Sequence, residues 1–246
     1  MLENNKKIAL VTGANKGIGF ETARQLAKQG ITVLLGARDE QKGSEAAVNL
    51  QNEGLDVQFL QLDVNDQASH QNAAKFIEDN FGRLDILINN AGIARDFQIP
   101  ASQSAVEQWR ETFETNVFSL VALTNALLPL IKKSQSGRIV NLSSILGSLA
   151  LQSDPNSPIA GGAHTGSAYA ASKAAVNMFT VNLANELKNT SIKVNAAHPG
   201  WVKTDMGGEA APLEIEDGAK TSVALATLPE NGFTGKYIHQ GEKLPW

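Results

Sequence analysis

Tyr169 and Lys173 stand four positions apart within Ala168–Lys188, a stretch whose apolar residues recur at helical spacing. On a helix, residues four apart lie on one face, so the phenol and the ammonium can approach each other. A nearby ammonium favours the phenolate, which predicts a pKa for Tyr169 below its usual value of about 10. Such a tyrosine could serve as a general acid or base. The same spacing also describes a surface pair that stabilises a helix by only a few tenths of a kcal/mol.

The serine pair Ser143–Ser144 follows the apolar segment Gly137–Leu142, which predicts a strand. Ligands of open α/β sheets bind beyond the carboxyl ends of the strands. A serine hydroxyl at that edge could donate a hydrogen bond to a substrate carbonyl and to the alkoxide that develops from it. Paired serines also occur as helix caps and turns. The sequence leaves open which of the two serines faces a ligand.

Three glycines, Gly13, Gly17 and Gly19, lie between an expected strand, Lys7–Thr12, and an expected helix, Ile18–Gln29. A turn in this position presents backbone N–H groups and a helix N-terminus to a pyrophosphate. Glycine allows the backbone to turn sharply and to approach the phosphates closely. The spacing is a variant of the dinucleotide-binding fingerprint, and it predicts a dinucleotide site rather than a simple tight turn.

Residues after the second expected strand bear on the choice of cofactor. Arg38 follows that strand, and a guanidinium binds phosphate through two hydrogen bonds. Lys16 in the glycine turn adds a second cation, so the sequence favours NADP over NAD. Asp39 is interpreted as the N-cap of the expected helix Glu40–Glu53 rather than as a ribose ligand.

The strands and helices that must position these residues alternate along the chain. Several of the strands are almost continuously apolar, as in a parallel sheet covered on both faces. The pattern predicts an α/β fold, a single-domain Rossmann-type doubly wound parallel sheet with helices on both faces, over residues 1–246. Loops are expected at about 152–166 and 205–216. The expected strands are Lys7–Thr12, Ile31–Gly36, Val57–Leu62, Leu84–Asn89, Arg138–Leu142 and Ile192–Ala197. The expected helices are Ile18–Gln29, Glu40–Glu53, Asp66–Phe81, Val106–Lys132, Ala168–Lys188 and a helix near Asp217–Leu228.

Composition excludes several classes of function. The 246 residues carry a net charge of −4, which argues against a general nucleic-acid binder. No cysteine is present, so thiol chemistry is excluded, and the four histidines show no metal-ligand spacing. The apolar stretch Leu120–Ile131 is too short to span a bilayer, and Met1–Lys7 is polar, unlike a secretory signal. We therefore expect a cytoplasmic protein without a metal, a membrane or a nucleic-acid partner.

Taken together, these motifs resemble the short-chain dehydrogenase/reductase family over essentially the whole chain. The matching segments are Thr12–Gly19, Asp63–Val64, Asn89–Gly92, Asn116, Ser144, Tyr169 with Lys173, and Pro199–Gly200, in the order of the family. The closer resemblance is to its NADPH-dependent carbonyl reductase branch, through Gly36–Asp39, Leu127–Ile131, His198–Met206 and the terminal Trp246.

The resemblance implies an NADPH-dependent reductase that transfers hydride to the carbonyl of a hydrophobic ketone or aldehyde. Tyr169 would transfer the proton, Lys173 would lower its pKa and hold the nicotinamide ribose, Ser144 would polarise the carbonyl, and Asn116 would order a proton relay. The implied cofactor-binding residues are Gly13, Asn15, Lys16, Gly17, Ile18, Gly19, Arg38, Asp63, Val64, Asn90, Ala91, Gly92, Tyr169, Lys173, Pro199, Gly200, Val202 and Thr204. The expected substrate-binding residues are Ser144, Ile145, Leu146, Tyr169, Trp201 and Met206.

The resemblance departs at one place, because the 25 positions from Ser144 to Tyr169 exceed the interval in the shorter members of the family. An insertion here could block a common oligomer interface, so a monomer is favoured over a homo-oligomer. Two alternative functions remain at this stage. One is an NAD-dependent alcohol or hydroxysteroid dehydrogenase, and the other is an NADP-binding sensor without catalysis.

Overall fold

The computed structural model describes residues 6–160 and 166–246, and in these ranges eight strands form one sheet in the order β3-β2-β1-β4-β5-β6-β7-β8. All neighbouring strands are parallel except β7 and β8, which are antiparallel. The strands are β1 (Ile8–Thr12), β2 (Thr32–Ala37), β3 (Val57–Gln61), β4 (Ile86–Asn89), β5 (Arg138–Leu142), β6 (Lys193–Ala197), β7 (Tyr237–His239) and β8 (Glu242–Lys243).

The burial of each strand follows its place in the sheet. Every residue of β1, β2 and β4 is buried, because these central strands are covered on both faces. The edge strand β3 instead mixes buried, half-buried and exposed side chains. The continuous apolar runs in the sequence therefore correspond to the centre of a doubly covered sheet.

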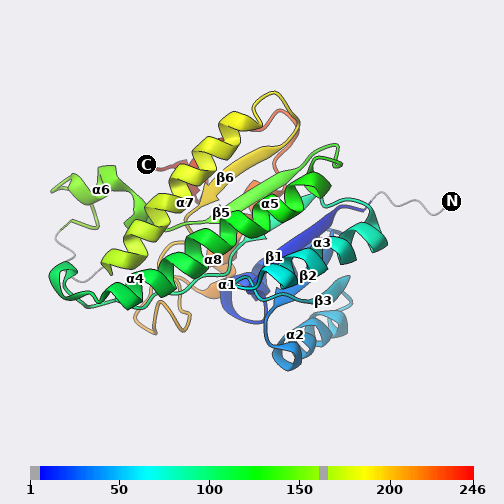
Figure 1. Ribbon diagram of the computed structural model, residues 1–246, viewed down its shortest axis with the longest axis horizontal. Coiled ribbons are helices and arrows are strands. Elements are labelled where there is room, and N and C mark those ends of the chain that lie inside the picture. Colours follow the sequence, from blue (N-terminus) through cyan, green and yellow to red (C-terminus); the bar gives the residue numbers. More distant parts are fainter. Residues whose placement is uncertain (1–5, 161–165) are drawn as a thin grey trace.

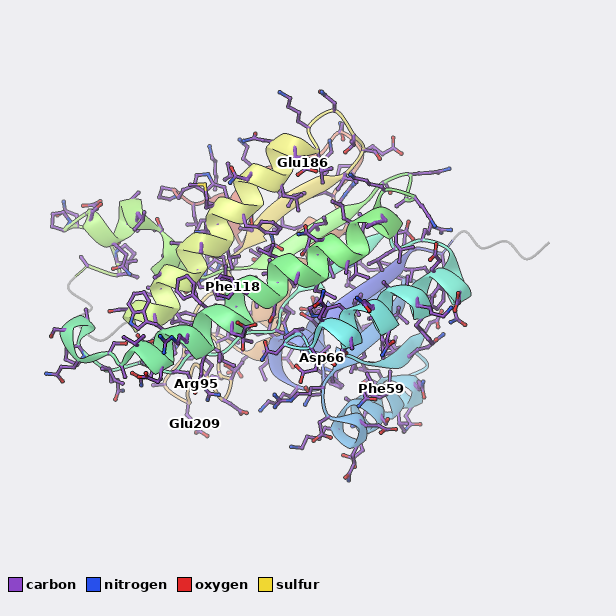
Figure 2. The ribbon with its side chains drawn as sticks, in the orientation of Figure 1. Phe59, Asp66, Arg95, Phe118, Glu186 and Glu209 are labelled. Carbon is purple, nitrogen blue, oxygen red and sulfur yellow. The ribbon has the colours of Figure 1, made fainter. Side chains whose placement is uncertain are left out.

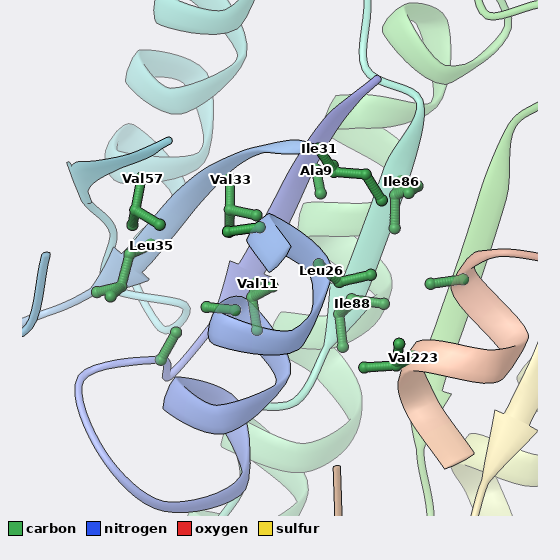
Figure 3. Close-up of a cluster of buried hydrophobic side chains, with 14 of the residues drawn as sticks. Ala9, Val11, Leu26, Ile31, Val33, Leu35, Val57, Ile86, Ile88 and Val223 are labelled. Carbon is green, nitrogen blue, oxygen red and sulfur yellow. The ribbon is translucent and has the colours of Figure 1, made fainter. Parts of the chain in front are cut away.

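Helices cover both faces of this sheet (Figure 1). One core cluster joins the sheet to α1, α2 and α8, and Figure 3 shows part of it, with Leu26 of α1 and Val223 of α8 beside strand residues such as Val11. A second cluster joins the other face to α3, α5 and α7. The helices are α1 (Gly17–Lys28), α2 (Glu40–Asn52), α3 (Gln67–Phe81), α4 (Val106–Phe113), α5 (Ser119–Ile131), α6 (Leu149–Ser153), α7 (Ser167–Glu186) and α8 (Ile215–Ala226).

A π-helical turn, Glu114–Phe118, joins α4 to α5. The resulting helical run, Val106–Ile131, has 26 residues and a mean hydropathy of 1.3 over its most apolar window. It is longer than Leu120–Ile131, the apolar stretch that the sequence predicted to be too short for a membrane. It is the one run in the described ranges that is long and apolar enough to cross a bilayer. More than half of that window is buried, as in a core helix that packs against protein.

The expected strands and helices are confirmed with small differences at their ends, except that the expected helix Val106–Lys132 is interrupted by the π-helical turn. The strands β7 and β8, the helix α6 and the short 3-10 turns were not expected, and α6 ends at Ser153, just inside the segment 152–166 that was expected to be a loop. Residues 161–165 of that segment lie outside the described residues. The segment 205–216 is irregular up to the start of α8, as expected.

Candidate active site

The glycine turn between β1 and α1 leaves a helix N-terminus available to an anion. Gly13 and Gly17 adopt left-handed φ angles of 63° and 58°, which disfavour any residue with a Cβ. The N-cap residue of α1, Lys16, makes no side-chain cap, and the first turn holds no acidic residue. The first N–H groups of α1 can therefore bind phosphate oxygens.

The segment after β4 forms the floor beneath this turn. The Asn90 side chain donates to the carbonyl oxygens of Thr12 at 2.8 Å and Gly13 at 3.2 Å. A Cβ on Gly13 would lie 3.0 Å from the Cα of Ala91, and a Cβ on Gly19 would lie 2.4 Å from the Asn90 Nδ2. These close contacts explain why glycines occupy the turn.

Arg38 lies at the wall of a cavity of about 510 Å³ at the carboxyl ends of β2 and β3. The cavity is lined by Arg38, Leu60, Gln61, Asp63, Asp66, Ser69, Asn72, Ala73 and Phe76. Within the described part of the chain, the guanidinium forms no hydrogen bond or ion pair, so it is free to bind a phosphate. Figure 2 labels Asp66, which caps α3 by accepting from the N–H groups of Ala68 and Ser69. Asp39 caps α2 through the N–H of Lys42 at 2.9 Å, as expected.

Lys16 lies in the glycine turn and has an acidic partner of its own. Its ammonium forms an exposed ion pair with Asp205 of the loop after β6, and Lys16 does not line the cavity beside Arg38. Thr204 lies against the glycine turn as well, since a Cβ on Gly17 would be 3.7 Å from its Cγ2. The turn and the segment 202–205 therefore meet across the expected cofactor cleft.

Helix α7, which packs against the sheet beside β5 and β6, carries Tyr169 and Lys173, and both side chains are almost completely buried. The Lys173 Nζ lies 5.6 Å from the centre of the Tyr169 ring and donates to the Leu142 carbonyl at the end of β5 at 2.8 Å. Ser144 follows the end of β5 and lies close enough to the Tyr169 phenol to lower its pKa. The structure thus brings the expected tyrosine, lysine and serine together.

The structure also distinguishes the two serines. The Ser143 hydroxyl donates to the Asn177 Oδ1 on α7 at 2.6 Å and is buried in the protein. Ser144 is the serine that influences the Tyr169 phenol, since it lowers the pKa of that group. The structure therefore distinguishes the two serines by their partners.

Burial controls the charge of the tyrosine and the lysine. It raises the pKa of Tyr169 to about 12, against the smaller opposite effect of Ser144. This direction is opposite to the one that an adjacent ammonium alone predicts, because removing the phenolate from water is the larger effect. Burial also lowers the pKa of Lys173 to about 8. At neutral pH the phenol thus carries its proton and can donate it.

Asn116 lies in the π-helical turn, a distortion that often marks functional positions. Its Oδ1 accepts from the Ile93 N–H at 2.8 Å, and its Nδ2 donates to the Ile93 carbonyl at 2.9 Å and to the Ser172 hydroxyl at 3.0 Å. A Cβ on Gly92 would lie 3.3 Å from that Oδ1 and 3.5 Å from the Lys173 Nζ. Asn116, Gly92 and Lys173 therefore converge.

The expected substrate-binding residues divide into two groups. Ile145 and Leu146 form a short 3-10 turn directly after Ser144. Trp201 and Met206 are exposed at the surface, and the Trp201 indole donates to the Gly207 carbonyl at 2.8 Å. The apolar surface next to Ser144 thus comes from Ile145 and Leu146, whereas Trp201 belongs to the loop between β6 and α8.

Two buried side chains of this region were not recognised in the sequence. The His198 Nδ1 accepts from the N–H groups of Ile145 at 3.3 Å and Gly200 at 3.4 Å, and burial lowers the pKa of His198 to about 3, so the ring is neutral. It joins the turn after Ser144 to the Pro199–Gly200 segment. The other is Asp96, whose carboxylate lies at the start of α7. A lone histidine or aspartate in a loop gives no sequence signal of such contacts.

Among the described residues, no group of three histidine, aspartate or glutamate side chains could hold a metal ion. The site is therefore built from backbone N–H groups, hydroxyls, one guanidinium and one ammonium.

Comparison with known proteins gives the same family throughout. A family model described as short chain dehydrogenase matches residues 7–214. Carbonyl reductase [NADPH] 1 of Mus musculus is 35% identical, with both chains fully covered. The (+)-neomenthol dehydrogenase of Arabidopsis thaliana is 37% identical over 93% of this chain and 94% of its own.

Solved structures agree with the sequence relatives. NADPH-bound carbonyl reductase from chicken fatty liver superposes with a TM-score of 0.85 at 30% identity, over 98% of this chain and 99% of that one. Salutaridine reductase from Papaver somniferum gives a TM-score of 0.83 at 32% identity, over 96% and 100% of the two chains. The expected fold class, a Rossmann-type doubly wound sheet, is confirmed.

Proposed function

The chain belongs to the short-chain dehydrogenase family, and the relatives compared above are oxidoreductases. We therefore propose that it reduces the carbonyl group of a hydrophobic ketone or aldehyde with NADPH. The observation that carries the proposal is the grouping of the buried Tyr169 phenol with Lys173, whose Nζ lies 5.6 Å from the ring centre, and with Ser144, which follows β5 at the carboxyl edge of the sheet. We further propose that residues 1–246 form one cofactor-binding domain, because the strands in the described ranges all join one sheet whose edge holds both the glycine turn and Tyr169.

The residues at the carboxyl edge of the sheet fit the phosphate groups of a dinucleotide. The glycine turn offers uncapped N–H groups of α1, Asn90 to Gly92 form the floor, and Arg38 offers an unpaired guanidinium for an additional phosphate. Asp63 and Val64 follow β3 and would hold the adenine, and the segment with Pro199, Gly200, Val202 and Thr204 would hold the nicotinamide end. NADPH, when bound, supplies the hydride.

The protein residues supply orientation and the proton. The Ser144 hydroxyl donates a hydrogen bond to the carbonyl oxygen and stabilises the negative charge that develops there. The Tyr169 phenol, which is protonated at neutral pH, transfers its proton to that oxygen, so that hydride and proton together convert the carbonyl to an alcohol. Lys173 then stabilises the phenolate, while Asn116 connects the lysine to a route for reprotonation.

The apolar surface beside Ser144 supports a hydrophobic substrate. Ile145 and Leu146 follow the serine directly, and Trp201 and Met206 lie on the loop above. Relatives named carbonyl reductase, neomenthol dehydrogenase and isopiperitenone reductase support a ketone or its alcohol as the reacting group.

The test is a screen of aromatic and bulky aliphatic ketones with NADPH and with NADH, followed through the absorbance of the reduced cofactor. Tyr169→Phe should lower kcat by about a thousandfold or more, because the proton donor is lost, while the Kd for NADPH changes little. Tyr237→Phe, which alters the other tyrosine of the chain, is the matched control and should keep its activity. Unchanged turnover in Tyr169→Phe would refute the assignment, and absence of turnover in the unmodified protein would favour a cofactor-binding sensor.

We also propose that the protein acts in the cytoplasm as a monomer. The insertion between Ser144 and Tyr169 includes α6, which packs beside the turn Ile145–Gly147 that follows Ser144. Light scattering coupled to size-exclusion chromatography tests the monomer, and a dimer or tetramer at micromolar concentration would contradict it.

A further inference from the structure

The helix that carries Tyr169 lacks an N-cap of its own. Residue Gly166 precedes α7 with a left-handed φ of 72°, and it has no side chain to accept from the first N–H groups. By contrast, α2, α3 and α6 are capped by the residue that immediately precedes each of them, Asp39, Asp66 and Ser148. The start of α7 therefore depends on a partner from elsewhere in the chain.

That partner is Asp96, which lies in the loop after β4, far from α7 in the sequence. Its Oδ2 accepts from the Ala168 N–H at 2.7 Å, and its Oδ1 accepts from the Tyr169 N–H at 3.3 Å. Ala168 and Tyr169 are the second and third residues of α7, the two positions whose N–H groups an N-cap side chain normally binds. Asp96 thus performs the function of an N-cap across the tertiary structure.

The burial of Asp96 indicates how strongly this contact is specified. The side chain is completely buried, and within the described residues it forms no ion pair with a lysine or arginine. Besides the two backbone groups, the Ser104 hydroxyl donates to its Oδ2 at 3.3 Å. A buried carboxylate is unfavourable unless hydrogen bonds and a positive potential compensate for lost water, and the N-terminus of α7 supplies both.

The residue after Asp96 contacts the same tyrosine. The Phe97 ring meets the Tyr169 ring edge to face, with centroids 5.1 Å apart and an angle of 62° between the planes. A Cβ on Gly166 would lie 2.9 Å from the Asp96 Oδ1 and 2.9 Å from the Phe97 Cδ1, so only glycine allows both side chains to approach. Backbone and ring of Tyr169 are therefore held by two consecutive residues.

The same loop also reaches the rest of the site. Gly92 lies beside Lys173, and Ile93 binds both polar atoms of the Asn116 side chain. Four positions separate Gly92 from Asp96, so a short segment contacts the lysine, the asparagine and the tyrosine in turn.

We propose that Asp96 is a positioning residue of the active site, which fixes the first turn of α7 and thereby the direction in which the Tyr169 phenol points. The inference rests on the proposed function, because it gives the position of Tyr169 a catalytic purpose. Asp96 does not touch the reacting atoms and acts through the helix and the tyrosine.

The experiment compares Asp96→Asn and Asp96→Ala in the full chain, with NADPH and isatin, an activated aromatic ketone, as probes. Asparagine caps helices about as well as aspartate, so Asp96→Asn should retain kcat within about fivefold. Asp96→Ala removes every acceptor and should lower kcat by about ten- to a hundredfold through misplacement of the phenol. The KM for NADPH should change by less than about twofold in both, because the glycine turn and Arg38 are unaffected.

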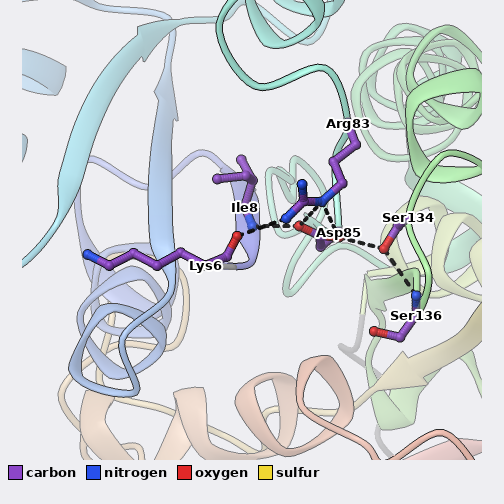
Figure 4. Close-up of polar contacts among 6 residues, drawn as sticks. All are labelled: Lys6, Ile8, Arg83, Asp85, Ser134 and Ser136. Carbon is purple, nitrogen blue, oxygen red and sulfur yellow. Dashed lines mark hydrogen bonds and ion pairs between the residues drawn. The ribbon is translucent and has the colours of Figure 1, made fainter. Parts of the chain in front are cut away.

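Hydrogen exchange gives a readout that does not require activity. In Asp96→Ala, the amides of Ala168 and Tyr169 should exchange at least about tenfold faster than in the unmodified protein, and Asp96→Asn should lie between. Asp85→Asn is the matched control, since Asp85 is also a buried carboxylate that accepts from a backbone N–H, that of Ile8, and from a serine hydroxyl, that of Ser134 (Figure 4). It should lower the melting temperature but leave kcat and the exchange of α7 unchanged.

Wild-type exchange at Ala168 and Tyr169 together with wild-type kcat in Asp96→Ala would overturn the inference. An equal loss of kcat in Asp85→Asn would also overturn it, because the effect would then be one of general stability. If Asp96→Ala does not fold, Gly166→Ala tests the same contact, since the added methyl group pushes an intact Asp96 away from the helix. If the unmodified protein reduces no ketone, the proposed function fails. Normal hydrogen exchange at Ala168 and Tyr169 in these variants would separately exclude the contact of Asp96 with the start of α7.

Discussion

Replacement of Arg38 by alanine should weaken the use of NADPH without weakening the fold. The side chain is exposed at the wall of the cavity beside Asp63 and Asp66, and in the described ranges it has no hydrogen-bonding or ionic partner. Its removal therefore breaks no contact that stabilises the folded state. The free energy of unfolding should change by less than about 0.5 kcal/mol.

The expected loss of binding follows from the charge of the cavity. A hydrogen bond between charged groups contributes about 1.5–3 kcal/mol, which corresponds to a factor of about 10 to 150 in affinity. Once the guanidinium is gone, the carboxylates of Asp63 and Asp66 remain and repel a phosphate. We expect kcat/KM for NADPH to fall by about 10- to 150-fold, and kcat/KM for NADH by less than about threefold.

The assay measures kcat/KM for both cofactors with the same ketone in the unmodified protein, Arg38→Ala and Arg38→Asp. Arg38→Asp should move the preference toward NADH, because a carboxylate can accept from the ribose hydroxyl. Arg110→Ala is the control for a change in net charge, since Arg110 is exposed and paired with Glu107. Equal losses with NADPH and NADH, or an NADH preference in the unmodified protein, would refute the assignment of Arg38 to the additional phosphate.

Two further predictions concern charge at the site. Burial lowers the pKa of Lys173 to about 8 from an unfolded value of 10.5, so the folded state is destabilised below pH 8, and the penalty is lost as pH rises toward 10.5. Lys173→Met removes this penalty, so it should raise the free energy of unfolding at pH 7 by up to about 3 kcal/mol while it abolishes turnover. Urea unfolding should show a smaller gain at pH 10, and a gain that is independent of pH would contradict this reasoning. Asp205→Asn releases Lys16 for a phosphate, so the KM for NADPH should fall by up to about threefold at low salt and be unchanged at high salt. A higher KM in that variant would instead mean that the ion pair holds the loop over the cofactor.

Local sequence was sufficient for the elements with strong patterns. The runs Ile8–Thr12 and Ile86–Asn89 are apolar at every position but the last, which only a strand covered on both faces accommodates, and the structure confirms both strands. The strands β7 and β8 have three and two residues, too few for any periodicity to appear. The place of β7 in the sheet is set by pairing with β6, a contact between distant parts of the chain, and β8 then pairs with β7.

The proximity of the candidate catalytic residues Tyr169 and Lys173 could also be predicted from the sequence, because both lie on one helix and helix geometry alone places them on the same face. The glycine turn was recognisable for a similar reason, since a tight turn between a strand and a helix requires residues without a Cβ.

Tertiary structure alone decided the choice between Ser143 and Ser144, the ion pair of Lys16 with Asp205, and the capping of α7 by Asp96. It also decided the protonation of Tyr169, because burial raises the pKa whereas the neighbouring ammonium predicted the reverse. Each of these depends on how much water surrounds a group and on which distant side chain replaces that water. Spacing along the chain describes neighbours on one element, but desolvation is a property of everything that packs around it.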